Sequence, residues 1–175
     1  TYICGNPPYV GNTKQSKSQK SDLQNLFGKN LKRWKSLDYV AGWFWKTFEY
    51  LQVESAKAGI VSTNSIVQGE QVPALWPTLF QHGVEIPFAV RSFKWRNLAS
   101  SNAGVTVVII GLSRAAPGQK QIYDDDDGKS TQRSVSSIGP YLQVGNTVSV
   151  IKSSSAADDR AKMVRGNLPN DGGYL

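Results

Sequence analysis

Near its start the chain reads Tyr2-Ile3-Cys4-Gly5-Asn6-Pro7-Pro8-Tyr9-Val10-Gly11. A short apolar run ends there in two consecutive prolines, which fix their own backbone and keep the preceding residue out of the helical region. The pattern therefore predicts a short strand with Asn6 held extended at its tip. In open α/β sheets, ligands bind beyond the carboxyl ends of the strands. We therefore expect a reacting group to be met at this tip.

The polar groups of the tip suit an amino group that is conjugated to a ring or a carbonyl. Asn6 offers a side-chain oxygen, and the rigid turn can aim the backbone carbonyl of Pro7 at the same point. Two such acceptors stabilise the positive charge that develops when an amino nitrogen attacks an electrophilic methyl group. Pro8 keeps the turn rigid, and Tyr9 adds a flat face on which a base can stack. A surface proline turn is the plainer alternative.

The tetrapeptide Asn6–Tyr9 resembles the signature of the amino-methyltransferases, Asn/Asp/Ser-Pro-Pro-Tyr/Phe/Trp, and most of all that of N6-adenine DNA and glutamine N5 protein enzymes. The resemblance implies that S-adenosyl-L-methionine donates the methyl group. It also implies that all four residues are catalytic positions and that Asn6 and Pro7 lie beside the cofactor. Such enzymes need a Gly-rich turn after their first strand, so the main cofactor site is expected upstream, in a missing N-terminal half. The chain is therefore expected to be a fragment that is inactive alone.

Composition limits the remaining possibilities. The 175 residues are enough for one ordinary domain, and a net charge of +7 favours a polyanionic partner. The single cysteine, Cys4, excludes an intramolecular disulfide. No stretch is long enough to span a membrane and the N-terminus lacks a signal-peptide pattern, so a cytoplasmic location is the default. We expect no metal, because zinc-ligand spacing is absent.

The segment 12–36 is strongly basic. It carries seven basic residues and one acid, spread among Ser, Gln and Asn, which predicts an exposed, mobile loop with one helical turn at residues 23–27. A solvated segment without a partner is the plainer alternative. Because the segment directly follows the tip, we expect it to contact DNA phosphates through three lysines in particular: Lys14, Lys17 and Lys20.

A helix is predicted from residue 38 to 57, where apolar residues recur every three or four positions. Ser36 or Asp38 can cap it, and Gly59 is expected to end it. A strand follows at 60–66, so the chain forms a β-α-β unit with parallel strands. This order places Asn64 beside the tip at the same sheet edge, where it either lines the substrate pocket or closes the next turn.

The next elements are a second helix and an extended pair. The helix is predicted from Pro73 to His82, with Pro77 kinking or limiting it. His82 is interpreted as a helix-end residue rather than a catalytic one. The segments 84–93 and 104–113 are predicted to form an antiparallel pair because their connection is short.

Aromatic and basic residues alternate at the end of this pair. Phe93 and Trp95 are candidates for the aromatic wall that holds an extruded base, whereas Arg91, Lys94 and Arg96 are candidates for contacts with the DNA backbone. Two aromatic residues packed at a hairpin edge are the plainer alternative. The order Phe-Lys-Trp followed by a β-branched strand resembles adenine methyltransferases that are fused within single-chain restriction-modification enzymes.

The predicted fold class is α/β. Residues 1–114 are expected to form the C-terminal half of a Rossmann-like methyltransferase sheet, with parallel strands and an antiparallel pair. Residues 115–175 are expected to be a mostly β and loop extension that contains a linker and the start of a target-recognition region. Within it, a strand is predicted at 120–123, a solvated acidic turn at 124–128 and strand-like structure at 138–150. A sheet edge left unpaired by the missing half carries a risk of self-association.

The leading functional hypothesis is S-adenosyl-L-methionine-dependent methylation of adenine N6 in double-stranded DNA, within a restriction-modification or phage-defence system. A protein-glutamine N5 methyltransferase is the main alternative. It is less favoured because the chain continues well past the antiparallel pair and is basic. A non-catalytic DNA-binding module is the second alternative.

Overall fold

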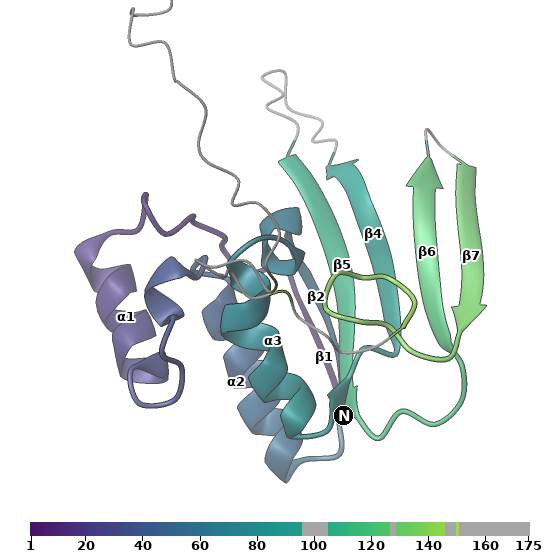
Figure 1. The fold of residues 1–175 in the computed structure, drawn as a ribbon, viewed down its shortest axis with the longest axis horizontal. Coiled ribbons are helices and arrows are strands. Elements are labelled where there is room, and N and C mark those ends of the chain that lie inside the picture. Colours follow the sequence, from purple (N-terminus) through teal and green to yellow (C-terminus); the bar gives the residue numbers. More distant parts are fainter. Residues whose placement is uncertain (96–104, 127–128, 146–149, 151–175) are drawn as a thin grey trace, which may run out of the picture.

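The computed structural model describes residues 1–95, 105–126, 129–145 and 150. The described residues form one mixed sheet and three α-helices (Figure 1). The helices are α1 (Lys17–Phe27), α2 (Ala41–Val53) and α3 (Gln71–Gln81), and the short 3-10 helices are η1 (Trp34–Ser36) and η2 (Asn64–Val67). The strands are β1 (Tyr2–Gly5), β2 (Lys57–Thr63), β3 (Val84–Glu85), β4 (Phe88–Trp95), β5 (Val105–Arg114), β6 (Lys120–Asp126) and β7 (Lys129–Val135).

The strands follow the order β1-β2-β5-β4-β6-β7, and β3 also pairs with β5. The pairs β1/β2 and β4/β6 are parallel, whereas β2/β5, β4/β5 and β6/β7 are antiparallel. It follows that β1, β2, β4 and β6 run in one direction and that their carboxyl ends lie at one edge of the sheet, uppermost in Figure 1. The predicted parallel unit and the predicted antiparallel pair are both confirmed.

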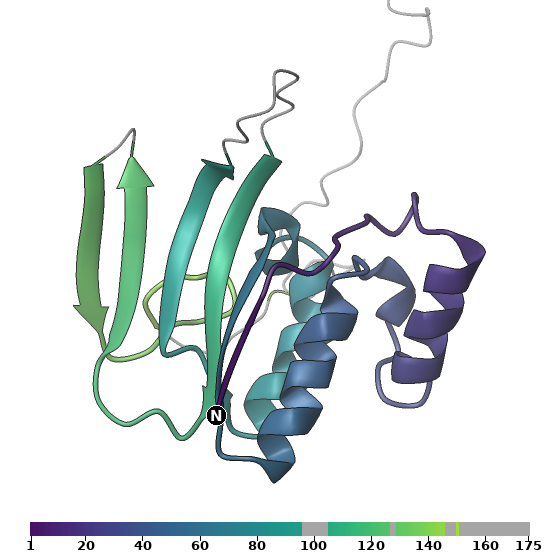
Figure 2. The same ribbon diagram turned by 180° about the vertical axis from the view of Figure 1, so that it is seen from behind.

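Helices α2 and α3 cover one face of the sheet over β1, β2 and β5, and α1 lies beyond them (Figures 1 and 2). Strand β2 shows the two faces clearly, since Ala58, Ile60 and Ser62 are buried and alternate with residues that are partly exposed. Their partners on β5 are Leu112, Ile110 and Val108, which are buried as well. The core therefore lies between the helices and this face of the sheet.

The prediction of a mobile loop over residues 12–36 is wrong for its central part, because α1 occupies residues 17–27. Ser16 begins the helix with a capping box, in which its hydroxyl accepts from the Gln19 amide and the Gln19 side chain accepts from the Ser16 amide. Leu23 and Phe27, four residues apart, are buried. Charged neighbours conceal this short apolar stripe in the sequence.

The predicted helix over residues 38–57 is shorter than expected. It begins at Ala41 and ends at Val53, and β2 starts at Lys57. Gly59 therefore lies inside β2 rather than at a helix end. It pairs with Gly111 of β5, and a Cβ atom at Gly111 would lie 2.5 Å from the ring of Phe88. These glycines thus make room for an aromatic ring on the sheet.

Helix α3 continues through Pro77 as far as Gln81, so the proline does not end it. The interpretation of His82 as a helix-end residue is confirmed: it follows the last helical residue, and its Nδ1 lies 2.8 Å from the carbonyl oxygen of Thr78. The extended segment 84–93 is divided into β3 and β4, since Pro87 between them lacks an amide hydrogen.

The sheet continues past residue 114, the expected end of the catalytic domain. Strand β6 extends to Asp126, so the acidic residues 124–126 lie in a strand rather than in a turn. Strand β7 was not predicted, and the predicted strand-like segment 138–150 contributes one isolated bridge, between Ile138 and Val144, among its described residues. The division of the chain into two domains stays a prediction. Strand β1 lies at one edge of the sheet, and self-association through it likewise stays a prediction.

Candidate active site

The sheet brings three of the predicted site segments to one edge. Asn6 directly follows β1, and Asn64 directly follows β2 and begins η2. Because β1 and β2 are parallel neighbours, with Gly5 beside Ile60, both asparagines lie at the carboxyl edge. Trp95 ends β4 at the same edge. The expected placement of Asn64 at the same sheet edge as the tip is therefore confirmed, while its contact with substrate stays a prediction.

The tetrapeptide Asn6–Tyr9 is partly fixed by the core and partly open. Asn6 and Pro8 are exposed, whereas Pro7 is buried. Tyr9 is half-buried and packs against the hydrophobic core. The amide of Asn6 is therefore accessible to a ligand, and the aromatic ring of Tyr9 is held by its neighbours.

The residue after this tetrapeptide is tied to the helical layer by three hydrogen bonds. The Val10 amide donates to Asp38 Oδ1 at 2.9 Å. The Val10 carbonyl accepts from the Tyr39 amide at 3.0 Å and from Gln15 Nε2 at 3.1 Å. From the sequence, Asp38 was considered only as a helix cap and Gln15 was not considered at all. Neither carries a local signal for this role.

Phe93 and Trp95 lie on β4 with their ring centroids 6.2 Å apart. An irregularity between Val90 and Phe93 inserts one extra residue into β4, since Val90 pairs with Ile109 and Phe93 with Val107. Val90 and Phe93 consequently lie on the same face and, together with Tyr123, line a hollow of about 430 Å³. Phe93 is partly exposed and Trp95 is exposed, so either ring is accessible to a base. The contact of one of them with an extruded base stays a prediction.

Arg91, predicted to contact DNA, forms an ion pair with Asp124 of β6. Asp124 also lies 3.4 Å from Arg133 of β7. The hydrogen bond from Arg91, with the charges of both arginines, holds the pKa of Asp124 below its usual value, although partial burial opposes the shift. Asp124 therefore links three strands through Arg91 of β4 and Arg133 of β7, and the contact of Arg91 with DNA stays a prediction.

Replacement of Asp124 with Asn should destabilise the sheet in a pH-dependent way. A carboxyl group with a lowered folded-state pKa contributes stability above its unfolded pKa of about 4, and this contribution is lost as the pH falls through the folded value. At neutral pH, thermal unfolding should show that the free energy of unfolding falls by roughly 0.5 to 1 kcal/mol. The loss is this small because solvent screens the ion pair. The difference should vanish in strong acid. The exposed Glu54→Gln variant controls for loss of one negative charge, and a difference that grows in acid contradicts the argument.

The basic residues near the tip face solvent. Lys14, Lys17 and Lys20 are exposed, the last two on α1, and Lys94 is exposed on β4. Arg96 lies outside the described residues. The lysines are therefore accessible to phosphates, but their contact with DNA stays a prediction.

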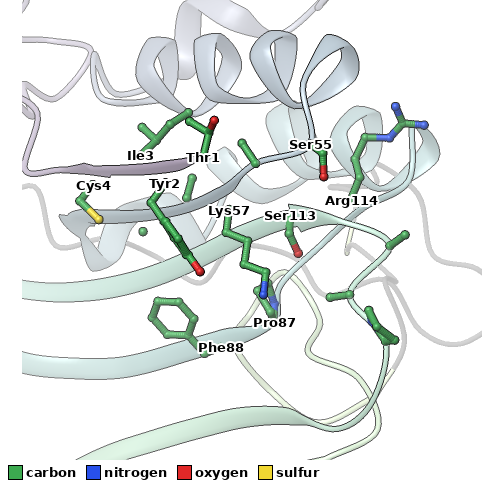
Figure 3. Close-up of a pocket in the computed structure, with 16 residues that line it drawn as sticks. Thr1, Tyr2, Ile3, Cys4, Ser55, Lys57, Pro87, Phe88, Ser113 and Arg114 are labelled. Atoms are coloured by element: carbon green, nitrogen blue, oxygen red, sulfur yellow. The ribbon is translucent and has the colours of Figure 1, made fainter.

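A hollow of about 630 Å³ lies at the opposite, amino edge of the sheet (Figure 3). Tyr2, Lys57 and Phe88, which begin β1, β2 and β4, contribute to its lining together with Cys4 and Ser113. Because the predicted tip lies at the carboxyl edge, this hollow is a separate feature and does not belong to the candidate active site.

The described part of the chain holds no group of three or more His, Cys, Asp or Glu residues that could hold a metal ion. None of its helices is long and apolar enough to cross a membrane.

Comparison with known proteins identifies the family. The family described as "MmeI, DNA-methyltransferase domain" matches residues 1–124. The chain belongs to this family. It is 45% identical over 175 residues to "DNA methyltransferase A" of Bacillus subtilis (strain 168), covering 99% of this chain and 19% of that protein. The chain thus spans about a fifth of the length of this relative.

A solved structure agrees with this assignment. The Type IIL restriction-modification enzyme MmeI in complex with DNA matches 98% of this chain and 23% of its own chain, with 42% sequence identity and a TM-score of 0.89. The mixed α/β sheet with three helices therefore matches part of MmeI. The resemblance to DNA methyltransferases of restriction-modification enzymes is confirmed at the level of the MmeI family.

Proposed function

We propose that this chain is the substrate-binding part of a longer, S-adenosyl-L-methionine-dependent DNA methyltransferase of the restriction-modification type, which methylates adenine at N6. The observation that carries the proposal is the exposed Asn6 of an Asn-Pro-Pro-Tyr turn at the carboxyl edge of the sheet, in a chain of a DNA-methyltransferase family. The MmeI structure contains DNA, which supports DNA as the substrate.

In this proposal the side-chain oxygen of Asn6 and the carbonyl oxygen of Pro7 accept the two N6 hydrogens of the target adenine. Both acceptors favour a nitrogen with a localised lone pair, and they stabilise the positive charge that develops on it during transfer. This arrangement needs no general base. Pro8 restricts the backbone that carries both oxygens.

An adenine inside a duplex is out of reach of this turn, so the base must leave the stack. Tyr9 offers one aromatic face, and Phe93 or Trp95 of β4 offers a second at the same sheet edge. Lys14, Lys17 and Lys20 near the tip, with Lys94, Arg96 and to a lesser degree the paired Arg91, bind the backbone around the extruded base. Asn64, at the start of η2 just after β2, lines the pocket that holds the extruded base.

S-adenosyl-L-methionine, when bound, supplies the electrophilic methyl group. The described edge fits the methyl acceptor rather than the body of the cofactor, because β1 is followed by Asn6, Pro7 and Pro8 instead of a Gly-rich turn. Asn6 and Pro7 are therefore proposed to lie beside the methyl group of the cofactor, on the side where the target adenine binds. The main cofactor site is therefore proposed to lie outside residues 1–175, so the isolated chain is expected to be inactive.

The proposed domain organisation follows from the same reasoning. Residues 1–114 belong to the catalytic domain, and residues 115–175 lead into a target-recognition region. The edge of β1 is the place where the missing part of the sheet would pair.

The experiment that tests the proposal identifies the methylated base. The longer enzyme is incubated with duplex DNA and S-adenosyl-L-methionine that carries an isotopically labelled methyl group, and the DNA is then digested to nucleosides. Label is expected in the deoxynucleoside N6-methyl-2′-deoxyadenosine. Label in a methylated cytosine, or in the protein instead of the DNA, contradicts the proposal.

A further inference from the structure

The turn that carries Asn6 has two points of attachment. The first is β1, which ends at Gly5. The second is Val10, whose amide and carbonyl both bond to residues of the helical layer. Between these points, Pro7 and Pro8 have no amide hydrogen, so they cannot bond the turn to its surroundings through backbone donors. The prolines fix the internal shape of the turn, whereas the two attachments fix its direction.

Asp38 forms the central contact of the second attachment. Its Oδ1 accepts from the Val10 amide at 2.9 Å and from the Val40 amide at 3.2 Å, just before α2 begins at Ala41. The Asp38 amide donates to Gln71 Oε1 of α3 at 3.0 Å. Asp38 is only 5% exposed. The buried carboxylate oxygen of Asp38 therefore ties the turn to the start of α2, and the Asp38 backbone amide ties it to the start of α3.

Gln15 completes this attachment from the segment before α1. Its Nε2 donates to the Val10 carbonyl at 3.1 Å and to the Leu37 carbonyl at 2.9 Å, and the residue is 8% exposed. A buried polar group that loses its partner costs free energy, so these bonds hold the backbone in one arrangement. Loss of either side chain releases a different atom of Val10.

We propose that Asp38, assisted by Gln15, is a positioning residue for methyl transfer. Neither side chain need touch the adenine or the cofactor. They fix Val10, and Val10 fixes the direction in which the oxygens of Asn6 and Pro7 point. The inference rests on the proposed function, because it assigns to these two oxygens the role of accepting the N6 hydrogens. A small displacement of a reacting geometry is enough to lower a rate strongly.

The test uses the longer enzyme with Asp38→Ala, Asp38→Asn and Gln15→Ala. Asp38→Ala should lower kcat about 100-fold while the KM values for DNA and S-adenosyl-L-methionine change less than about 3-fold. Asp38→Asn should recover most of the rate, since its side-chain oxygen still accepts from Val10. Gln15→Ala should lower kcat about 10-fold, because the Tyr39 amide still bonds to the Val10 carbonyl.

The matched control is Asp22→Ala. Asp22 accepts from the Tyr39 hydroxyl at 3.0 Å, so this variant removes a side-chain contact between α1 and Tyr39 but none of the three hydrogen bonds to Val10. It should keep the wild-type kcat. An unchanged kcat in Asp38→Ala overturns the inference, as does an equal loss of rate in Asp38→Ala and Asp22→Ala at equal loss of Tm. If Asn6→Ala also retains full activity, the proposed function itself is wrong; if Asn6→Ala is inactive, only the positioning role fails.

Discussion

Asn6→Ala in the longer enzyme should lower kcat for DNA methylation about 1,000-fold, at the upper end of what one preorganised hydrogen-bonding group contributes to a transition state. The loss corresponds to about 4 kcal/mol of activation free energy. The reason is that the positive charge on the amino nitrogen develops only during transfer, so the Asn6 oxygen stabilises the transition state more than the bound substrate. DNA affinity, which depends mostly on the phosphate contacts, should change less than about 3-fold.

The control for this prediction is Asn12→Ala. Asn12 is exposed, lies in the same loop beyond Val10 and loses the same side chain. Its kcat should match that of the wild type. Single-turnover kinetics and a DNA-binding titration on the same preparations separate the two roles of the turn. A large loss of DNA affinity with normal turnover in Asn6→Ala would mean that the turn binds the substrate and does not catalyse.

The parts of the fold that the sequence predicts best are those in which local chemistry restricts the backbone. Pro7 and Pro8 end β1 at the expected place, and the β-branched run of β5 forms a buried strand. The parallel arrangement of β1 and β2 follows from the predicted helix between them, which corresponds to α2. The order of strand, helix and strand in the sequence is therefore enough to place the turn and Asn64 at the same carboxyl edge of the sheet.

Helix α1 shows why local patterns can also fail. The basic and polar residues of this segment favour a solvated loop, whereas the helix is stabilised by only a few buried contacts, chiefly Leu23 and Phe27. The signal that was available is the Ser-x-x-Gln spacing of Ser16 and Gln19, which forms the capping box. Helix α3 illustrates the opposite case, since tertiary packing carries it through Pro77 despite the missing amide.

The polar contacts around the candidate site were beyond the reach of sequence patterns because they join distant positions. Asp38 and Val10 are 28 residues apart, and Arg91 and Asp124 are 33 residues apart. Each pair meets only after the helices and strands have packed. An aspartate before a helix predicts a cap, but no side chain caps α2 at its N-cap residue Val40, so the expected cap by Ser36 or Asp38 is wrong. The bond that Asp38 accepts from Val10 instead depends on the whole topology.

Trp76→Ala should be the most destabilising single replacement in the helical layer, with a loss of about 4 kcal/mol in the free energy of unfolding. Trp76 of α3 is fully buried and packs edge-to-face on Phe44 of α2, with ring centroids 5.8 Å apart. Its Nε1 donates to the Ile66 carbonyl at 2.8 Å. Truncation therefore leaves a cavity and a buried carbonyl without its donor.

Denaturant unfolding followed by far-UV circular dichroism measures this loss. Trp76→Phe should lie between wild type and Trp76→Ala, because it keeps much of the ring packing but loses the bond to Ile66. Trp43→Ala is the matched control, since Trp43 lies on α2 with 49% of its surface exposed. This replacement should lower the free energy of unfolding by less than about 1 kcal/mol. Because Ile66 lies in η2, two residues after Asn64, loss of this bond should also loosen the β2 end of the candidate site. Equal stabilities of Trp76→Ala and Trp43→Ala would show that packing around Trp76 does not hold these layers together.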